Sequence, residues 1–384
     1  MAFRKILATK IFTGKEIFEN KILLLSESGT IEAVVSPQEA GDNIEKMDGI
    51  LSPGFVNCHC HLELSHMRNA IGEGTGLVDF VGKIMRLRQF PEEEIMEAIA
   101  QADREMYGNG TVAIGDICNT SHTHDTKKHS PVRYRNFIEI AGFLPQQAAE
   151  RMEQGRRLKA KYEQTGPTSI VPHAPYSVSR ELFGMINEDS KGTTISIHNE
   201  ETRDENLFFK EKKGAFPDLY KRMGIPTDFF QPSGKSSIQT YLPYLDRPSS
   251  VLLVHNTFLD EVDIQLAQDE ADKNHQHLYW TLCPNANWYI ERKLPPVDLL
   301  LSAQVNICLG TDSIASNYQL SIWSEIQRLQ QHFPAIPLKE MLVWATYKGA
   351  QALGFQEHLG SFEKGKKPGV VLIDTEQGTA KRIV

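Results

Sequence analysis

The sequence is poor in cysteine, with five among 384 residues. An odd number leaves no complete set of disulfide pairs, and most of the five lie in or beside apolar stretches that we expect to be buried strands. This placement is typical of small, reduced core residues and predicts a cytoplasmic location. The five are Cys58, Cys60, Cys118, Cys283 and Cys308.

Long apolar runs and long basic runs are also absent. No stretch approaches the roughly 20 apolar residues that a membrane span needs. The segment Met1–Lys10 interrupts its apolar residues with charges, so it lacks a signal-peptide core. The formal net charge of -8 argues against a surface that binds nucleic acid or an anionic membrane. We therefore expect a small-molecule substrate, with no nucleic-acid partner and no membrane partner.

Two histidines, His59 and His61, stand in a short apolar stretch between Pro53 and Glu63. Side chains in a strand alternate with period two, so residues i and i+2 point to the same side and can bind one metal ion. A pair of buried, hydrogen-bonded histidines explains the same spacing. The rest of the chain must decide between these two interpretations.

Three later apolar runs lead directly into His198, His255 and Asp312. Continuous apolar runs followed by helix-like sequence are typical of parallel strands that are covered on both faces. In a closed (β/α)8 barrel the carboxyl ends of the strands share one rim, so these residues would converge with His59 and His61. The three runs are Thr194–Ile197, Val251–Val254 and Val305–Thr311.

Strand and helix signals alternate along most of the chain, which predicts eight strands and an α/β fold. We predict a (β/α)8 TIM barrel over residues 52–357 and a small β-sandwich built from residues 1–51 and 358–384. The other barrel strands are expected within Pro53–Glu63 and at Thr111–Asp116, Tyr134–Ile140, Ser169–Pro172 and His277–Leu282, with helices over Leu77–Arg88 and Pro91–Tyr107. The sandwich strands are expected at Ile6–Ile11, Lys21–Leu25, Gly29–Val35 and within Gly360–Ile373.

Three neutral imidazoles and one carboxylate form a ligand set that suits zinc or ferrous iron. We predict that His59, His61, His198 and Asp312 hold one divalent ion per chain, with zinc as the expected ion and iron as the alternative. Such an ion lowers the pKa of water from about 15.7 towards about 7. The ligand set therefore predicts hydrolysis at a carbon centre.

Hydrolysis also needs groups that move protons. Glu201 lies three residues after His198, beyond the strand end, and is the predicted general acid and base. Its neighbour Glu200 stays an alternative, because strand parity does not separate the two carboxylates. We expect His255 to hydrogen-bond to the attacking water or the tetrahedral carbon, and Asp312 to accept a proton as well as bind the metal.

Substrate contacts are predicted at His173, Asn285 and Trp288, which follow the fourth and seventh strands. Each also fits a structural role, as a hydrogen-bonded core histidine or a packing tryptophan. Several charged residues are either substrate contacts or solvated helix faces: Arg86, Arg88, Glu139 and Arg203. The polar segment 119–131 is expected to be a loop over the rim, with solvated histidines rather than a second metal site: His122, His124 and His129.

These motifs together resemble the amidohydrolase superfamily, and within it the aminohydrolase branch of guanine, cytosine and S-adenosylhomocysteine deaminases and chlorohydrolases. The similarity extends over almost the whole chain. The matching segments are Pro53–Asn57 with His59 and His61, His173–Tyr176, His198 with Glu201, His255, Cys283–Asn287, Gly310–Ser313 and the strand within Gly360–Ile373.

The resemblance implies a distorted barrel, a single metal ion and the hydrolytic removal of ammonia from an amino-substituted heterocycle. It gives Glu201 the role of carrying protons to a ring nitrogen and His255 that of assisting the water. The predicted fourth strand, Ser169–Pro172, has no lysine that could bridge two ions, which disfavours a binuclear site. A homodimer is common in the family.

The segments Leu62–Ser65 and Gly74–Phe80 are similar to bacterial members that include aminodeoxyfutalosine deaminases of menaquinone synthesis. The leading substrate is therefore a 6-aminopurine nucleoside such as aminodeoxyfutalosine. One alternative is a chlorohydrolase or N-alkylamine hydrolase that acts on triazine-like rings with the same metal site. The other is a catalytically silent protein that binds a small molecule or assists assembly, although every expected site position is filled.

Overall fold

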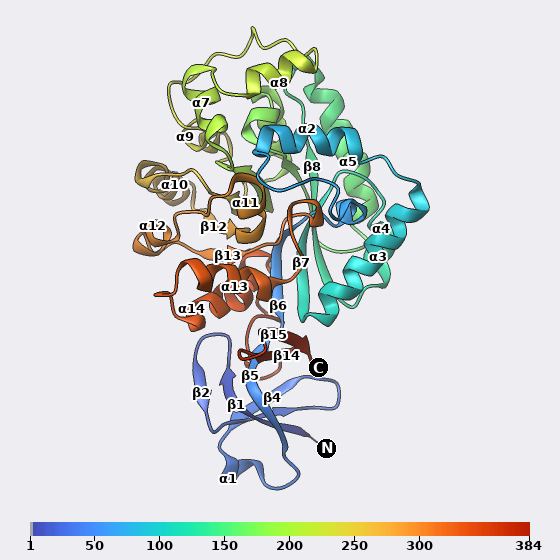
Figure 1. Ribbon diagram of the computed structural model, residues 1–384, viewed down its shortest axis with the longest axis vertical. Helices are drawn as coiled ribbons and strands as arrows, with labels where there is room; N and C mark the ends of the chain where they lie inside the picture. Colours follow the sequence, from blue (N-terminus) through green and yellow to red (C-terminus); the bar gives the residue numbers. More distant parts are fainter. Residues whose placement is uncertain (1–2) are drawn as a thin grey trace.

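Both ends of the chain contribute to one mixed seven-stranded sheet in the computed structural model, which describes residues 3–384 (Figure 1). Its strands are β1 (Arg4–Phe12), β2 (Ile17–Glu19), β3 (Ile22–Leu25), β4 (Ile31–Val35), β5 (Glu45–Pro53), β14 (Val370–Asp374) and β15 (Thr379–Arg382). Their order is β15-β14-β5-β1-β3-β4, with β2 paired to β1. The first two residues of the predicted domain segment 1–51 lie outside the described residues.

The central strands form two four-stranded parallel sheets. The first contains β6 (Phe55–Cys60), β7 (Thr111–Cys118), β8 (Arg133–Ile140) and β9 (Thr168–Pro172); the second contains β10 (Thr194–Asn199), β11 (Ser250–His255), β12 (His277–Leu282) and β13 (Ile307–Leu309). Every residue of β6, β7 and β10 is buried, as expected for parallel strands that are covered on both faces. The sheets meet at a parallel bridge between Cys60 and Asp312, and where the His198 N–H donates to the His173 carbonyl at 3.0 Å.

Helices connect the parallel strands and pack on their outer faces (Figure 1). In α3, Ile95, Ile99, Ala102 and Met106 recur at helical spacing and are buried, while glutamates in the first turn complement the helix dipole. The α-helices are α1 (Pro37–Ala40), α2 (Leu77–Leu87), α3 (Glu92–Gly108), α4 (His124–His129), α5 (Ala148–Tyr162), α6 (Arg180–Asp189), α7 (Arg203–Glu211), α8 (Phe216–Arg222), α9 (Ser237–Tyr241), α10 (Glu261–Asn274), α11 (Pro284–Glu291), α12 (Val297–Ser302), α13 (Ile322–His332), α14 (Leu338–Val343) and α15 (Gly349–Ala352).

Short helical turns complete the connections. The 3-10 helices are η1 (Leu62–Met67), η2 (Pro145–Gln147), η3 (Pro175–Ser177), η4 (Leu242–Tyr244) and η5 (Ile314–Ser316), and η6 (Trp344–Lys348) is a π-helical turn. Several of these follow the carboxyl ends of strands, so they carry the chain away from the point where the functional side chains gather.

The predicted α/β class is confirmed, and the two predicted early helices match α2 and α3 to within one residue at each end. The last parallel strand is shorter than predicted, because β13 covers only Ile307–Leu309. The predicted loop 119–131 is partly helical, since it contains α4. All five cysteines are buried and unpaired, as expected for reduced core residues.

Among residues 3–384, no helix combines the length and the apolar content that crossing a membrane requires.

Candidate metal centre and active site

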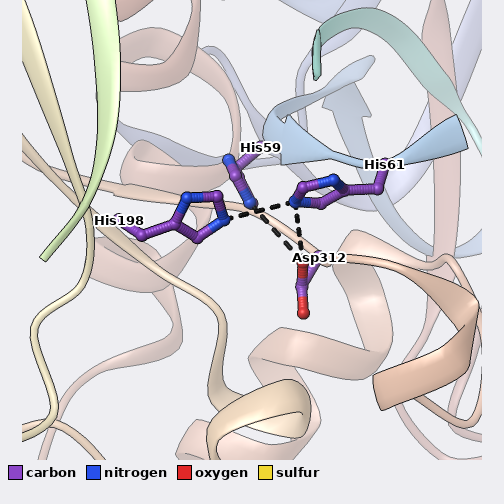
Figure 2. A group of neighbouring side chains, drawn as sticks. All are labelled: His59, His61, His198 and Asp312. Atoms are coloured by element: carbon purple, nitrogen blue, oxygen red, sulfur yellow. Dashed lines mark hydrogen bonds and ion pairs between the residues drawn. The ribbon is translucent and has the colours of Figure 1, made fainter. Parts of the chain in front are cut away.

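Four side chains at three strand ends point toward one another (Figure 2). His59 and His61 come from β6 and the residue after it, His198 comes from β10, and Asp312 follows β13. Asp312 Oδ1 lies 3.5 Å from His59 Nε2 and 3.3 Å from His61 Nε2, and the Nε2 atoms of His61 and His198 are 3.3 Å apart. The structure thus brings together all four residues that the sequence suggests as metal ligands.

The backbone at this point has left-handed conformations that non-glycine residues rarely adopt. The φ angles are 44° at Glu200, 76° at His255 and 58° at Asp312. Each such residue costs about 1–2 kcal/mol, so the surrounding structure must impose the conformation. At Asp312 the turn is held by the His59 carbonyl, which accepts the N–H groups of Thr311 at 2.9 Å and Asp312 at 3.1 Å. These turns end the strand alternation, and those at His255 and Asp312 direct the two side chains to the site.

Burial lowers the pKa values of His59, His61 and His198, so the three imidazoles are neutral at pH 7. The Nδ1 atom of His198 donates to the His173 carbonyl at 2.7 Å, which leaves the Nε2 lone pair facing the centre. Burial raises the pKa of Asp312, but His61, His255 and a hydrogen bond from Ser316 offset this effect, and the pKa lies below its usual value. The donor set is therefore three neutral nitrogens and one carboxylate.

His59 supplies the observation that fits a metal ion. Both of its ring nitrogens are buried and have no hydrogen-bond partner in the part of the chain that the structure describes. An unpaired buried polar group costs about 1–3 kcal/mol, and a cation among the four ligand atoms would satisfy Nε2. Glu139, His173 and His198 form a second compact group. Because the Nδ1 atom of His198 is already hydrogen-bonded, the first group suits a metal ion better than the second.

Glu201 and His255 lie beside this centre. The Nε2 atom of His255 is 3.6 Å from Glu201 Oε1, and Asn287 Nδ2 lies 3.3 Å from His255 Nδ1. An amide donor at Nδ1 leaves the imidazole proton on Nε2, where it faces Glu201. Burial, reinforced by the carboxylates of Asp312 and Glu205, raises the pKa of Glu201 well above its usual value. The raised pKa favours the protonated carboxyl of Glu201, which is the form that can act as an acid.

A cavity of about 480 Å³ opens beside the centre. His61, His198, Glu201, His255 and Asp312 line its inner end. Most of the remaining wall is apolar and comes from α2, β8 and α5, and it includes Leu77, Phe80, Ile84, Ile138 and Leu158. A largely apolar pocket with a few converging polar groups suits a flat heterocycle with an extended substituent.

Of the three predicted substrate contacts, the structure brings only His173 to this cavity. Asn285 instead hydrogen-bonds to Glu325 and Ser324 on α13, and the Trp288 ring packs against His332 with ring centroids 4.9 Å apart. The prediction that Asn285 and Trp288 line the pocket is therefore corrected, because both face α13.

The charged residues that the sequence suggests as possible substrate contacts differ in their exposure to solvent. Arg88 and Glu139 line the cavity, whereas Arg86 and Arg203 are exposed. The histidines of the segment 119–131 make local contacts and belong to no ligand group among residues 3–384. His129 is exposed and its Nδ1 lies 2.8 Å from the Asp125 carbonyl; His122 and His124 are half-buried, with Nδ1 atoms 3.2 Å from Thr120 Oγ1 and 2.8 Å from Asp125 Oδ1.

Comparison with known proteins places the chain in a family. Residues 50–383 match the sequence profile described as "Amidohydrolase family". The chain belongs to the amidohydrolase family. This match confirms the resemblance at the level of the superfamily, and with the deaminases among the relatives it supports a hydrolase that acts on carbon–nitrogen bonds other than peptide bonds.

Two curated relatives of this amidohydrolase are deaminases by name. The 5-methylthioadenosine/S-adenosylhomocysteine deaminase of Moorella thermoacetica is 26% identical over 367 residues, covering 88% of this chain and 76% of that protein. The adenosine deaminase of Helicobacter pylori is 23% identical over 334 residues, covering 83% and 78%. Among solved structures, the Helicobacter pylori aminofutalosine deaminase in complex with methylthio-coformycin has a TM-score of 0.79 at 20% identity, covering 99% of this chain and 100% of that one. At this identity it shows a shared fold.

The site of this amidohydrolase contains one buried carboxylate that the sequence analysis missed. Glu205, in the first turn of α7, accepts the backbone N–H of Glu200 at 3.0 Å and that of Glu201 at 3.4 Å, and Ser237 Oγ also donates to it. Thr202 and Glu205 have the spacing of a capping box, a pattern in the sequence that marks the start of a helix and could have pointed to Glu205. Here the glutamate reaches past the N-cap and holds the backbone of the predicted proton carrier.

We expect Glu205→Ala to lower kcat by about 10- to 100-fold without loss of the metal ion. Two backbone N–H groups would lose their acceptor, each at a cost of about 1–3 kcal/mol, and Glu201 would lose its fixed position. Measurements of kcat, metal content and thermal stability test this. Glu205→Gln keeps an acceptor oxygen, so its kcat should lie between those of the native protein and of Glu205→Ala. Glu211→Ala, at the exposed end of α7, is the matched control. Native kcat in Glu205→Ala would contradict the positioning role.

Proposed function

We propose that this amidohydrolase is a metal-dependent deaminase that removes ammonia from a 6-aminopurine nucleoside, with aminodeoxyfutalosine as the leading substrate. The observation that carries the proposal is the position of the buried Glu201, whose pKa is raised well above its usual value by burial, beside a three-histidine, one-carboxylate cluster that lines an apolar cavity. The deaminases among its relatives support the same chemistry.

In this proposal His59, His61, His198 and Asp312 hold one zinc ion. Their chemistry fits zinc, and a zinc-bound adenosine deaminase of Xanthomonas campestris shares the fold with a TM-score of 0.72. When bound, the ion supplies Lewis acidity and makes water acidic enough to react at neutral pH.

Each residue around the cluster then has its own role in moving protons. Glu201 donates a proton to a ring nitrogen next to the amino-bearing carbon, which makes that carbon more electrophilic. His255, with its proton on Nε2, orients the oxygen that attacks, and Asp312 accepts a proton from it. A new carbon–oxygen bond forms and the carbon–nitrogen bond breaks. The ring nitrogen keeps the proton from Glu201, one proton of the water reaches the departing amine, which leaves as ammonia, and the other proton of the water returns to Glu201.

His173 is proposed to contact the substrate. Its Nδ1 lies 2.7 Å from Ser177 Oγ, and the ring lines the cavity next to His198. Burial lowers its pKa to about 4, so the ring is neutral above that pH and can offer one donor or one acceptor to a heteroatom. The apolar wall formed by α2 and α5 would hold the 5′ substituent of the nucleoside.

We further propose that the two parallel sheets are the halves of a distorted (β/α)8 barrel over residues 52–357. The Cys60–Asp312 bridge on one side and the His198–His173 hydrogen bond on the other support this closure. Residues 1–51 and 358–384 would form the β-sandwich. A cytoplasmic location, a homodimer and the absence of nucleic-acid and membrane partners stay predictions.

Ammonia release by protein of measured metal content tests the proposed function. We expect the highest kcat/KM for aminodeoxyfutalosine within a panel that also contains adenosine, S-adenosylhomocysteine, guanine, cytosine and triazines. Fast release from one purine nucleoside at about one ion per chain would support both the site and the substrate class. No release from any purine nucleoside at full metal occupancy would contradict the proposal, and release of chloride or an alkylamine from a triazine would replace it.

A further inference from the structure

A lysine that the proposed chemistry does not use is fully buried behind the metal centre. Lys127, on α4, has its Nζ atom 2.5 Å from Asp116 Oδ2 and 3.0 Å from both Cys118 Sγ and Asn136 Oδ1. The rings of Tyr134 and Tyr162 lie 5.1 Å and 4.8 Å from it. Burial lowers the pKa of Lys127, but Asp116 more than offsets this, so the side chain stays cationic. Charged lysines are almost never buried to this extent unless they are paired.

The partner of Lys127 connects to the metal ligands. Asp116 Oδ2 meets the lysine, while its other oxygen, Oδ1, accepts the backbone N–H of Leu62 at 2.8 Å. Leu62 directly follows His61, at the point where β6 ends and η1 begins. The two oxygens of one carboxylate therefore join α4 to the backbone that carries the histidine pair.

The regular strand pairing is weakest at the same place. The register between β6 and β7 shifts between Asn57 and Cys60, so the segment that contains His59 lacks a continuous ladder with β7. On its other side β6 is held by Thr311, which follows β13, through the hydrogen bonds of Thr311 with Asn57 and the His59 carbonyl. On the β7 side the pairing resumes where Cys60 faces Asp116, and the Asp116 side chain extends this contact to the Leu62 N–H.

We propose that the Lys127–Asp116 pair is a positioning device for the metal ligands His59 and His61. Lys127 compensates the buried charge of Asp116, and Oδ1 of that carboxylate holds the Leu62 N–H and with it the direction in which His61 leaves β6. The inference rests on the proposed function to the extent that the histidine pair binds the ion. It differs from a purely stabilising ion pair, because the acceptor oxygen, not the charge, carries the effect on the metal.

Two double variants separate these roles, since both remove the buried charges and differ only in the acceptor. D116N/K127M keeps an oxygen for Leu62, whereas D116L/K127M replaces it with an apolar side chain of similar shape. We expect a chelator to remove zinc from the loaded D116L/K127M protein about 10- to 100-fold faster than from the native protein, and from D116N/K127M within about threefold of native. K159M/D189N removes a partly buried pair between α5 and α6 and should leave zinc release unchanged.

Equal zinc release from D116L/K127M and the native protein would overturn the proposal, as would equally fast release from the two Asp116 variants. If D116L/K127M does not fold, site-resolved hydrogen exchange decides: the Leu62 amide should be as protected as the amides of β7 in the native protein and in D116N/K127M. Rapid exchange there would overturn the proposal. A native protein that binds no zinc would instead be a failure of the proposed metal site, which is a distinguishable result.

Discussion

Replacing Glu201 with glutamine is expected to lower kcat by about 10²–10⁴-fold while the metal content stays at the native level. Glutamine has nearly the same shape but cannot transfer a proton, and general acid–base catalysis contributes about this factor. Because Glu201 is not one of the four clustered ligands, the metal site should survive. Steady-state kinetics and metal analysis on the same preparation check the prediction. Retained turnover with full metal occupancy would remove Glu201 from the mechanism.

Glu200→Gln is the matched control, because strand alternation alone does not decide which of the neighbouring residues Glu200 and Glu201 transfers the proton. Glu200 is fully buried, its carboxylate oxygens have no hydrogen-bond partner among the described residues, and it does not line the cavity. Burial raises the pKa of Glu200 well above its usual value, so an uncharged amide is a mild replacement. We expect kcat within about threefold of native. Inactivity of Glu200→Gln together with an active Glu201→Gln would exchange their roles.

The cluster of His59, His61, His198 and Asp312 could be predicted from the sequence because the positions of these residues follow strand geometry. His59 and His61 share a face by the period of two, and His198 and Asp312 follow apolar runs. The period of two does not apply to residues that follow a strand. The predicted substrate contacts after the seventh parallel strand therefore fail. Asn285 and Trp288 lie on α11 with helical spacing i, i+3, so both face α13, whereas Asn287 lies on another face and reaches His255.

The sequence also gave no sign of the buried pair behind the site. A lysine in a polar segment is ordinarily solvated, and the burial of Lys127 depends on Asp116 and on two tyrosines from other elements. Likewise, eight strands were predictable, but not where their pairing would be interrupted. The two parallel sheets meet near the site at single contacts such as Cys60–Asp312, which no local pattern encodes. Local periodicity thus predicts the elements and the ligands, while long-range side-chain contacts determine how the ligands are held.

Removing a metal ligand should have the other large effect. We expect His61→Ala to lose most of the bound ion and more than about 10³-fold in activity, because the ion contributes several kcal/mol to transition-state stabilisation and about 1.36 kcal/mol corresponds to tenfold. The melting temperature should fall as well, since an ion present at 100 times its Kd stabilises the native state by about 2.7 kcal/mol. Metal analysis, kinetics and thermal unfolding measure the three effects.

The controls for this experiment separate a ligand from other histidines nearby. His129→Ala removes an exposed imidazole of the segment 119–131 and should leave all three quantities unchanged. His173→Gln removes a ring that lines the cavity but lies outside the cluster of four, so KM should rise while the metal stays bound. Loss of metal in His173→Gln but not in His61→Ala would indicate that the ion binds to the group of Glu139, His173 and His198. In that case His59, whose ring nitrogens have no partner among the described residues, would need another explanation.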